Sequence, residues 1–287
     1  MPVTHSPLRY PGGKAQLSSF IEEIFSINGI SAPVYIEPFS GGAGLALSLL
    51  FDGKVSRVIL NDYDISIYAL WYSILYETEA LIEKILTTNI DINEWEKQKE
   101  IYKKSNGDDL LSLGFSTLFL NRTNRSGIIK AGVIGGKAQL GKYKLNCRFN
   151  VNSIVNKIRK ISSYVDCINL YNLDVIDLID NVIIKENESK TFIFFDPPYY
   201  KKGKDLYANF FTRKDHEILC SRIKSLNNYS WIVTYDDCDE IREIYQEIPS
   251  YTYGLNYSLA VKKKAMERIF FSDNIKLNTE YKSISLS

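Results

Sequence analysis

The sequence of 287 residues predicts an α/β protein in which a mostly helical, basic insertion interrupts a sheet. Short β-prone runs alternate with helical patterns at the start of the chain and again after residue 166. The stretch between them has helical periodicity, followed by a glycine-rich loop region without acidic residues. Hydrophobic residues make up 45% of the chain and charged residues 24%, which is ordinary for a globular protein.

Each element follows from a local pattern of apolar residues and turn formers. In the first part, strands are expected over 34–39 and 55–60, and a tight turn at 41–44 leads into a helix over 45–51. Helical periodicity predicts further helices over 65–76, 80–86, 95–102, 110–120 and 153–163. After the insertion, we expect strands over 167–171, 192–195 and 231–234, and helices over 175–184, 214–225 and 240–244. The chain then forms an antiparallel pair, 251–259 and 268–271, around Lys262, Lys263 and Lys264.

Composition excludes several classes of protein. No apolar run approaches the roughly 18 residues of a membrane span, and the first 14 residues lack the apolar segment of a secretory signal. The four cysteines are isolated, so we expect neither a metal site nor a disulfide framework, and a reducing cytoplasm is the default location.

Charge is distributed unevenly, although the net charge is only +1. No acidic residue lies between Asp109 and Asp166, and that stretch carries ten positive charges: Arg122, Arg125, Lys130, Lys137, Lys142, Lys144, Arg148, Lys157, Arg159 and Lys160. This segregation predicts a surface that binds a polyanion. The alternative is a solvated loop region whose acidic partners lie elsewhere in space.

The most informative segment is Asp196-Pro197-Pro198-Tyr199, which follows the apolar run 191–195. Two prolines end a buried strand abruptly, so the Asp196 carboxylate and the Tyr199 ring are expected at its carboxyl end. Ligands bind at that edge in open α/β sheets. A fixed acceptor beside a flat ring suits a planar base with an exocyclic amine, whereas the alternative is a simple strand-terminating turn.

The turn at 39–44 is the second candidate site. Its glycines allow close backbone approach to a ligand, and Asp62 follows the next strand, where a carboxylate can accept from ribose hydroxyls. Asp62 could equally cap the following helix. Leu47 replaces the third glycine of a dinucleotide fingerprint, and Gly12-Gly13-Lys14 lacks the other residues of a phosphate loop.

Four segments, in this order, resemble the Dam-type (D12 class, α-group) DNA adenine-N6 methyltransferases: 6–14, 37–44, 61–62 and 196–199. Residues 119–124 and Ser126-Gly127 are similar to that family's target-recognition region. The resemblance implies a Rossmann-like S-adenosylmethionine-dependent methyltransferase sheet with an inserted, mostly helical target-recognition domain. The expected domains are 1–75 with 164–287 for catalysis and cofactor binding, and 76–163 for DNA binding.

The resemblance also implies site residues. Lys14 would lie near the methionyl carboxylate of S-adenosylmethionine, and Phe39 and the glycine turn would lie beneath methionine. Asp62 would lie on the ribose and Asp174 near the adenine ring. The full set of expected cofactor residues is Tyr10, Lys14, Glu37, Phe39, Gly41, Gly42, Gly44, Asp62, Asp174 and Asp196. Expected DNA contacts are Arg122, Asn124, Arg125, Ser126, Lys130, Arg148, Lys201, Lys202 and Lys263. Because 124–127 departs from the aromatic-Asn-Gly segment of some members, GATC specificity is not implied.

The expected reaction is methyl transfer to adenine N6 in double-stranded DNA after base flipping. The catalytic residues would be Asp196, Pro197, Pro198 and Tyr199, with Asp196 and the Pro197 carbonyl accepting from the amine and Tyr199 stacking on the base. The alternatives are cytosine-N4 methylation of DNA, adenine-N6 methylation of RNA, or a catalytically silent DNA-binding regulator. We expect a monomer or weak dimer without membrane contact, a prokaryotic or phage-encoded protein in the cytoplasm near the nucleoid, and a cognate restriction endonuclease as a candidate partner.

Overall fold

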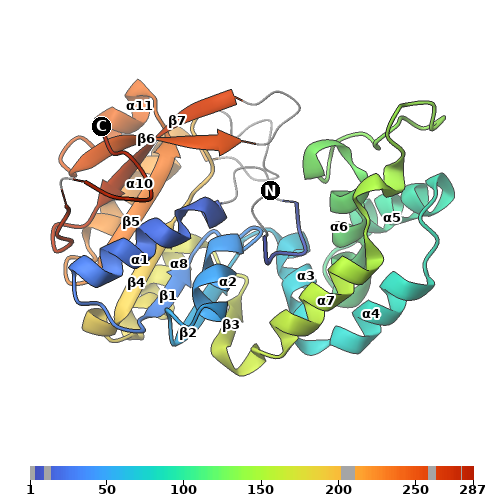
Figure 1. Cartoon of the computed structure of the whole chain (residues 1–287), viewed down its shortest axis with the longest axis horizontal. Helices are drawn as coiled ribbons and strands as arrows, with labels where there is room; N and C mark the ends of the chain where they lie inside the picture. Colours follow the sequence, from blue (N-terminus) through green and yellow to red (C-terminus); the bar gives the residue numbers. More distant parts are fainter. Residues whose placement is uncertain (1–3, 10–13, 202–210, 258–262, 279) are drawn as a thin grey trace.

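The computed structural model describes residues 4–9, 14–201, 211–257, 263–278 and 280–287 (Figure 1). These residues form one seven-stranded sheet of order β3-β2-β1-β4-β5-β7-β6. The strands are β1 (Val34–Glu37), β2 (Arg57–Asn61), β3 (Ile168–Tyr171), β4 (Thr191–Phe195), β5 (Ser230–Asp236), β6 (Ser250–Tyr257) and β7 (Lys263–Phe271). All neighbouring pairs from β3 to β5 are parallel, and β7 runs antiparallel to β5 and β6. The strand order reverses between β1 and β4, which opens a crevice at their carboxyl ends.

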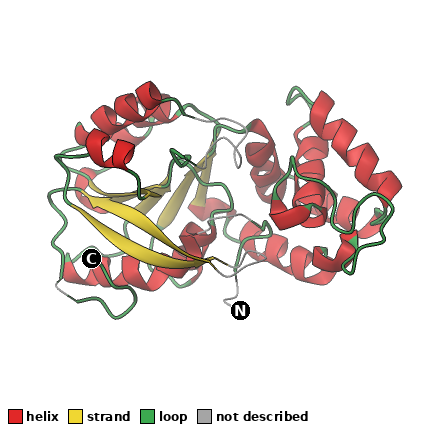
Figure 2. Ribbon diagram, turned by 90° about the horizontal axis from the view of Figure 1, so that it is seen from above, coloured by secondary structure: helices red, strands yellow, loops and turns green. Residues whose placement is uncertain are grey.

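The sheet is buried on both faces, which explains the continuous apolar strand sequences. Along β4, Phe192 and Phe194 belong to one core, whereas Ile193 and Phe195 belong to the other. Helices α1 (Ser18–Ile27) and α2 (Gly44–Phe51) pack against the first face. The second face is covered by α8 (Val175–Asn181), α10 (Arg213–Lys224) and α11 (Asp239–Ile244), and Figure 2 shows helices on both sides of the strands.

A helical lobe lies at one end of the molecule in Figure 1. It contains α4 (Thr78–Thr87), α5 (Ile92–Lys104), α6 (Leu110–Thr123) and α7 (Val151–Ser162). Its connection to the sheet is α3 (Ile65–Tyr76), which packs closely on α6. A Cβ on Gly114 of α6 would lie 2.6 Å from the carbonyl oxygen of Ala69, so glycine is required at this crossing. The domain boundary predicted at residue 76 stays a prediction.

Side-chain caps begin most of these helices. Asp64, Asp91, Asp109 and Asn150 each accept a hydrogen bond from a backbone N–H in the first turn of α3, α5, α6 and α7. Asp64, not Asp62, caps α3, so the alternative role considered for Asp62 is wrong.

The predicted elements are present, with three differences. Helix α1 was not predicted; it follows the 3-10 turn η1 (Lys14–Leu17), and its N-cap, Leu17, makes no side-chain bond that would mark its start. Helix α8 ends at Asn181 and is followed by the 3-10 turn η5 (Ile183–Lys185). Strand β7 begins at Lys263 rather than 268, because its first residues pair with the end of β6.

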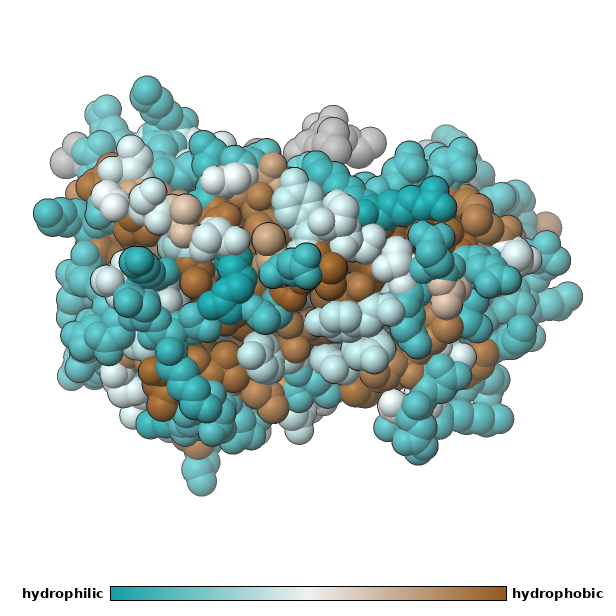
Figure 3. Space-filling view, turned by 90° about the horizontal axis from the view of Figure 1, so that it is seen from below, coloured by the Kyte–Doolittle hydropathy of each residue, from teal (hydrophilic) through white to brown (hydrophobic). Residues whose placement is uncertain are grey.

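The protein surface is ordinary for a globular protein. The face seen from below in Figure 3 is mostly hydrophilic, with hydrophobic residues in groups between polar ones. Within the described ranges, no helix is both long enough and apolar enough to cross a membrane. The same part of the chain holds no group of three His, Cys, Asp or Glu side chains arranged to bind a metal ion.

Candidate functional site

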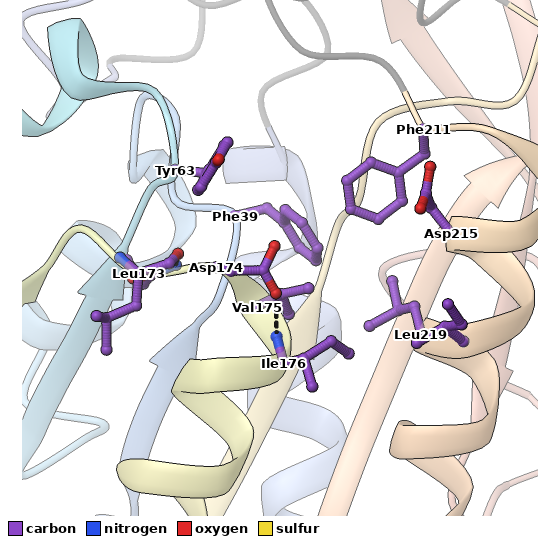
Figure 4. A pocket seen from close by; sticks show the side chains of 11 residues that line it. Phe39, Tyr63, Leu173, Asp174, Val175, Ile176, Phe211, Asp215 and Leu219 are labelled. Carbon is purple, nitrogen blue, oxygen red and sulfur yellow. Dashed lines mark hydrogen bonds between the residues drawn. The ribbon is translucent and has the colours of Figure 1, made fainter.

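A cavity of about 430 Å³ opens at the carboxyl ends of β1, β2 and β3 (Figure 4). Phe39 and Phe211 form an aromatic wall, with their ring centroids 5.9 Å apart and edge to face. Asp174 lines the cavity and accepts from the N–H of Ile176 at 2.8 Å, the dashed line in Figure 4. A volume in this range, with aromatic walls and few polar groups, is typical of a small-molecule site.

The predicted turn after β1 forms one edge of this region. Gly41 adopts φ +45°, and its N–H donates to Asp62 Oδ2 at 2.8 Å. The Gly41 carbonyl accepts from Trp71 Nε1 at 2.9 Å. Ala43 also adopts φ +45°. This left-handed conformation is uncommon for residues other than glycine, so the alanine in the sequence gave no indication of it. At the start of α2, a Cβ on Gly44 would meet the Cβ of Ala15 at 3.4 Å.

Two carboxyl groups beside the turn have raised pKa values. Burial, with the nearby charge of Asp64, raises the pKa of Asp62 to about 7. Burial, with the charge of Asp196, raises the pKa of Glu37 to about 8. Glu37 accepts from the N–H of Ala46 at 2.9 Å in the first turn of α2 and is 6% exposed. Glu37 therefore stabilises the turn from beneath, and cofactor contact through it stays a prediction.

Asp196 lies at the end of β4, as predicted, and its carboxylate is held from two sides. Lys14 Nζ lies 2.8 Å from Oδ1 and 2.9 Å from Oδ2, and Thr234 Oγ1 donates to Oδ1 at 2.7 Å. Burial raises the pKa of Asp196, the Lys14 ammonium opposes this, and the charge of Glu267 adds to it. Lys14 therefore contacts the carboxylate of the predicted catalytic residue, and its contact with a cofactor carboxylate stays a prediction.

Tyr199 belongs to the same buried group. Its hydroxyl accepts from Lys14 Nζ at 2.8 Å and donates to Glu267 Oε1. The ring is 7% exposed, and Lys14 Nζ lies 5.1 Å from its centroid. Burial raises the pKa of the Tyr199 hydroxyl well above its usual range, so this group stays a protonated donor. A base that stacks on Tyr199 must reach a ring that is largely covered in this structure.

A group of four cations lies where residues 4–9 meet the helical lobe; we call it the cation cluster: Arg9, Arg122, Arg148 and Lys157. The Arg122 guanidinium donates to the Arg148 carbonyl at 3.5 Å, and Lys157 Nζ donates to the Ser6 carbonyl at 3.0 Å. Arg9 Nη1 and Arg122 Nε are buried without a hydrogen-bond partner among the described residues.

The charges of the cation cluster repel one another. Burial and the charge of Arg9 lower the pKa of Arg122 to about 10. Burial lowers the pKa of Arg9, with a contribution from Arg148, and that of Lys157, with a contribution from Arg122. Within the described part of the chain, none of the four forms an ion pair with an acidic side chain. Positive charge without acidic partners among the described residues produces a local potential that attracts anions.

Comparison with known proteins identifies the family. The sequence profile of the D12 class N6 adenine-specific DNA methyltransferases matches residues 10–266. The chain belongs to this family. It is a site-specific DNA methyltransferase, its substrate is DNA, and S-adenosylmethionine is its methyl donor. The predicted family, activity, cofactor and α/β methyltransferase fold are therefore confirmed.

Individual relatives are distant. The type II methyltransferase M.MjaIII of Methanocaldococcus jannaschii is 25% identical over 222 residues, which cover 72% of this chain and 73% of the relative. The type II methyltransferase M.CviBI of Paramecium bursaria Chlorella virus NC1A is 25% identical over 245 residues, covering 83% and 85%. Among solved structures, a putative RNA methyltransferase from Pyrococcus horikoshii has a TM-score of 0.42 at 9% identity, covering 92% of this chain and 85% of its own.

The remaining predicted DNA residues of the methyltransferase differ in their exposure. Arg125, Ser126 and Lys130 are exposed on the loop after α6. Asn124 is 1% exposed; its Oδ1 accepts from Trp95 Nε1 at 2.7 Å, and its Nδ2 donates to the Ile129 carbonyl at 2.7 Å. These two bonds hold the loop, and a DNA contact through Asn124 stays a prediction.

Some cations of the basic stretch between Asp109 and Asp166 form ion pairs with acidic side chains from other parts of the fold. Lys137 pairs with Glu96 at 2.9 Å and Arg159 with Glu79 at 3.7 Å, as the solvated-loop alternative expects. Lys201, after the tetrapeptide, pairs with Glu240 at 3.3 Å. Tyr10 and Lys202 lie outside the described residues, and only the backbone of Lys263 is described.

Sequence reasoning missed several residues of the methyltransferase site. Thr234 and Asp236 end β5, the neighbour of β4, so their position at the same edge was a usable signal; Asp236 accepts from the N–H groups of Tyr200 and Lys201 at 2.9 and 3.1 Å. Glu267 lies inside a strand and gave no such signal. Arg9 stood within a recognised motif but was not assigned a role.

Proposed function

We propose that this methyltransferase acts on double-stranded DNA, flips the target adenine out of the duplex and holds its N6 amine at Asp196. The observation that carries this proposal is the position of the Asp196 carboxylate. It is fixed by Lys14 and Thr234 at the end of β4, beside the strand-order reversal and the aromatic cavity. Cofactor and base would then meet at one edge of the sheet.

The lone pair of an exocyclic adenine amine is delocalised into the ring, so the amine is a poor nucleophile. Hydrogen bonds from N6–H to the Asp196 carboxylate and the Pro197 carbonyl would localise that pair, and these acceptors are fixed before the reaction. S-adenosylmethionine, when bound, would supply an electrophilic methyl group. The bond from N6 to the methyl carbon would form as the carbon–sulfur bond breaks, the bonding pair would stay on sulfur as a neutral thioether, and N6 would release one proton. Positioning supplies much of the acceleration.

For the cofactor, we propose the cavity at β1, β2 and β3. Phe39 and Phe211 would enclose the adenine ring of S-adenosylmethionine, with Asp174 at its edge. Asp62 would accept from the ribose hydroxyls, because its oxygens retain free acceptor positions beyond the N–H groups of Gly41 and Asp64. The glycine turn would lie beneath the methionine portion.

For the DNA, we propose that the cation cluster binds backbone phosphate. Two of its guanidinium nitrogens are buried without partners among the described residues, so an anion would satisfy these donors. Flipping a base costs a few kcal/mol, and phosphate contacts contribute the affinity that offsets it. The exposed Arg125 and Lys130 lie on the same loop region and would extend this surface.

Other expectations depend on the cellular context. Both curated relatives are type II methyltransferases, which supports a search for a cognate restriction endonuclease. The monomeric or weakly dimeric state and the cytoplasmic, nucleoid-associated location stay predictions.

The experiment that tests the proposal compares wild type with Asp196→Ala on duplex and single-stranded oligonucleotides. Labelled methyl transfer should be faster on the duplex and fall at least 10³-fold in the variant, a loss on the order of a removed preorganised group or larger. Cofactor binding, measured by calorimetry, should remain detectable. Modification-sensitive sequencing of DNA from expressing cells would identify the base and its context.

Asp91→Ala provides the matched control, because Asp91 caps α5 of the helical lobe and neither lines the cavity nor contacts Asp196 in the structure. It should cost about 1 kcal/mol of stability and leave methyl transfer unchanged. Substantial transfer by Asp196→Ala, or a preference for single strands, would show that the proposal is wrong.

A further inference from the structure

Glu267 is a carboxylate in the interior of the protein, next to the proposed catalytic residues. It comes from β7 and is 1% exposed. Its Oε1 accepts from the Tyr199 hydroxyl, and its Oε2 accepts from the Tyr253 hydroxyl of β6 at 2.6 Å. Lys14 Nζ lies 3.5 Å from Oε2. Each oxygen of Glu267 therefore has a tyrosine donor, and one of these donors belongs to the proposed catalytic tetrapeptide.

Lys14 is shared between two carboxylates. Its ammonium lies 2.8 Å from Asp196 and 3.5 Å from Glu267, and it also donates to the Tyr199 hydroxyl. Among the described residues, this one ammonium faces two carboxylates, so the described group carries an excess negative charge. An ion pair that served stability alone would not need a second carboxylate. Apolar residues can often replace a buried ion pair without loss of stability, so stability does not explain why Glu267 is present.

The excess charge has a use in methyl transfer. As the amine attacks the sulfonium, positive charge moves from sulfur towards N6, which lies at Asp196 in the proposed function. A fixed negative group beside N6 stabilises the transition state more than the ground state, and only such a difference raises the rate.

We propose that Glu267, supported by Tyr253, is a positioning residue for methyl transfer that acts through Tyr199 and Lys14. It fixes the hydroxyl end of Tyr199 and draws part of the Lys14 charge away from Asp196, which leaves Asp196 a stronger acceptor for N6–H. This inference rests on the proposed role of Asp196. It adds a residue from the antiparallel edge of the sheet to a site otherwise built from strand ends.

The arrangement makes a prediction about pH. Burial first, and then the charge of Glu267, raises the pKa of Asp196, while Lys14 lowers it. The titratable groups that face Asp196 from the surrounding elements are Lys14, Tyr35, Glu37, Tyr199, Tyr253 and Glu267. Asp196 must be ionised to accept a hydrogen bond from the amine. Its protonation therefore sets the pH below which kcat falls, which is the acid limb of the profile of kcat against pH. Removing the Glu267 charge should lower the pKa of Asp196 and move that limb to lower pH.

The test uses the full-length enzyme and two variants. Glu267→Gln keeps the size but removes the charge; we expect kcat to fall about 10- to 100-fold, KM for cofactor and DNA to change less than about threefold, and the acid limb of kcat to shift to lower pH. Tyr253→Phe removes one hydrogen bond and keeps the charge, so kcat should fall less and the acid limb should stay in place. Glu186→Gln, which disrupts a distant ion pair with Arg57, is the matched control and should leave kcat and the limb unchanged.

Three results would overturn the inference. They are a wild-type kcat in folded Glu267→Gln, an unmoved acid limb in that variant, or an equal shift of the limb in Tyr253→Phe. Failure of the inference is distinguishable from failure of the proposed function, because the latter is decided by methyl transfer in Asp196→Ala. If Asp196→Ala is inactive and Glu267→Gln behaves as wild type, only the role of Glu267 is wrong.

Discussion

Replacing Arg122 with methionine should stabilise the free protein and weaken its binding to DNA. Arg122 is half-buried in the cation cluster, where its buried Nε has no partner among the described residues and the charge of Arg9 opposes its own. Methionine keeps the apolar stem and removes the charge. A gain in stability together with a loss of binding is expected of a residue kept for function.

The magnitude follows from the pKa of Arg122, which is lowered to about 10. A cation whose folded-state pKa lies two to three pH units below its unfolded-state value costs the folded state about 3 kcal/mol. Because part of the side chain is solvated, we expect about 1–3 kcal/mol. Because the pKa of Arg122 is lower in the folded state than in the unfolded state, its charge destabilises the folded protein fully at neutral pH. This destabilisation decreases only when the pH rises above about 10 and the folded-state guanidinium loses its proton.

Urea denaturation at pH 7 measures the first effect, and fluorescence anisotropy with a labelled duplex over a range of salt concentrations measures the second. If Arg122 binds one phosphate, the slope of log affinity against log salt should decrease by about 0.9. Arg57→Met is the contrasting control: it breaks the pair with Glu186, so it should destabilise the protein and leave the slope unchanged. A destabilised Arg122→Met with an unchanged slope would refute the reasoning, because Arg122 would then be a structural residue.

Two further predictions concern the junction of the lobes and the cofactor site. Gly127→Ala should lower the free energy of unfolding by about 2–4 kcal/mol, because its φ is +78° and a Cβ would lie 2.2 Å from the Arg9 carbonyl oxygen. Gly132→Ala, with nothing within 4 Å of its Cβ, should be near neutral in the same thermal or urea unfolding measurement. Cofactor affinity, titrated calorimetrically, should rise from pH 6 to pH 8, because Asp62, with a pKa of about 7, accepts from ribose hydroxyls best when ionised. An Asp62→Asn variant that retains this pH dependence would contradict the assignment.

Much of the architecture is local and was therefore predictable. Five apolar residues followed by two prolines define β4 and its end, and both features depend only on adjacent residues. Capping side chains such as Asp109 mark helix starts for the same reason. Helix α1 was missed because its N-cap makes no side-chain hydrogen bond. The length of β7 was underestimated because strand pairing with β6, rather than the sequence of β7, sets its start.

The contacts that make the site work are not local. Lys14 meets Asp196 across 182 residues, and Tyr199 meets Glu267 across 68. The order of the strands decides the second contact, because β4 and β7 flank β5 in the sheet. Lys14 lies in the 3-10 turn η1, and the packing of η1 on α2 decides where it lies. In the same way, the packing of residues 4–9 on the helical lobe brings Arg9 to Arg122, and the fold brings Trp95 to the buried side chain of Asn124.

The sequence by itself therefore determined the fold class and the family, and it predicted the catalytic tetrapeptide, because these depend on short-range periodicity and on residue order. Only the tertiary structure decided which charges are neighbours. The surrounding residues decide how far each ionisable group is removed from water and which charges lie beside it. These two factors set the pKa values of the site, and the same packing decides which donors have no partner among the described residues.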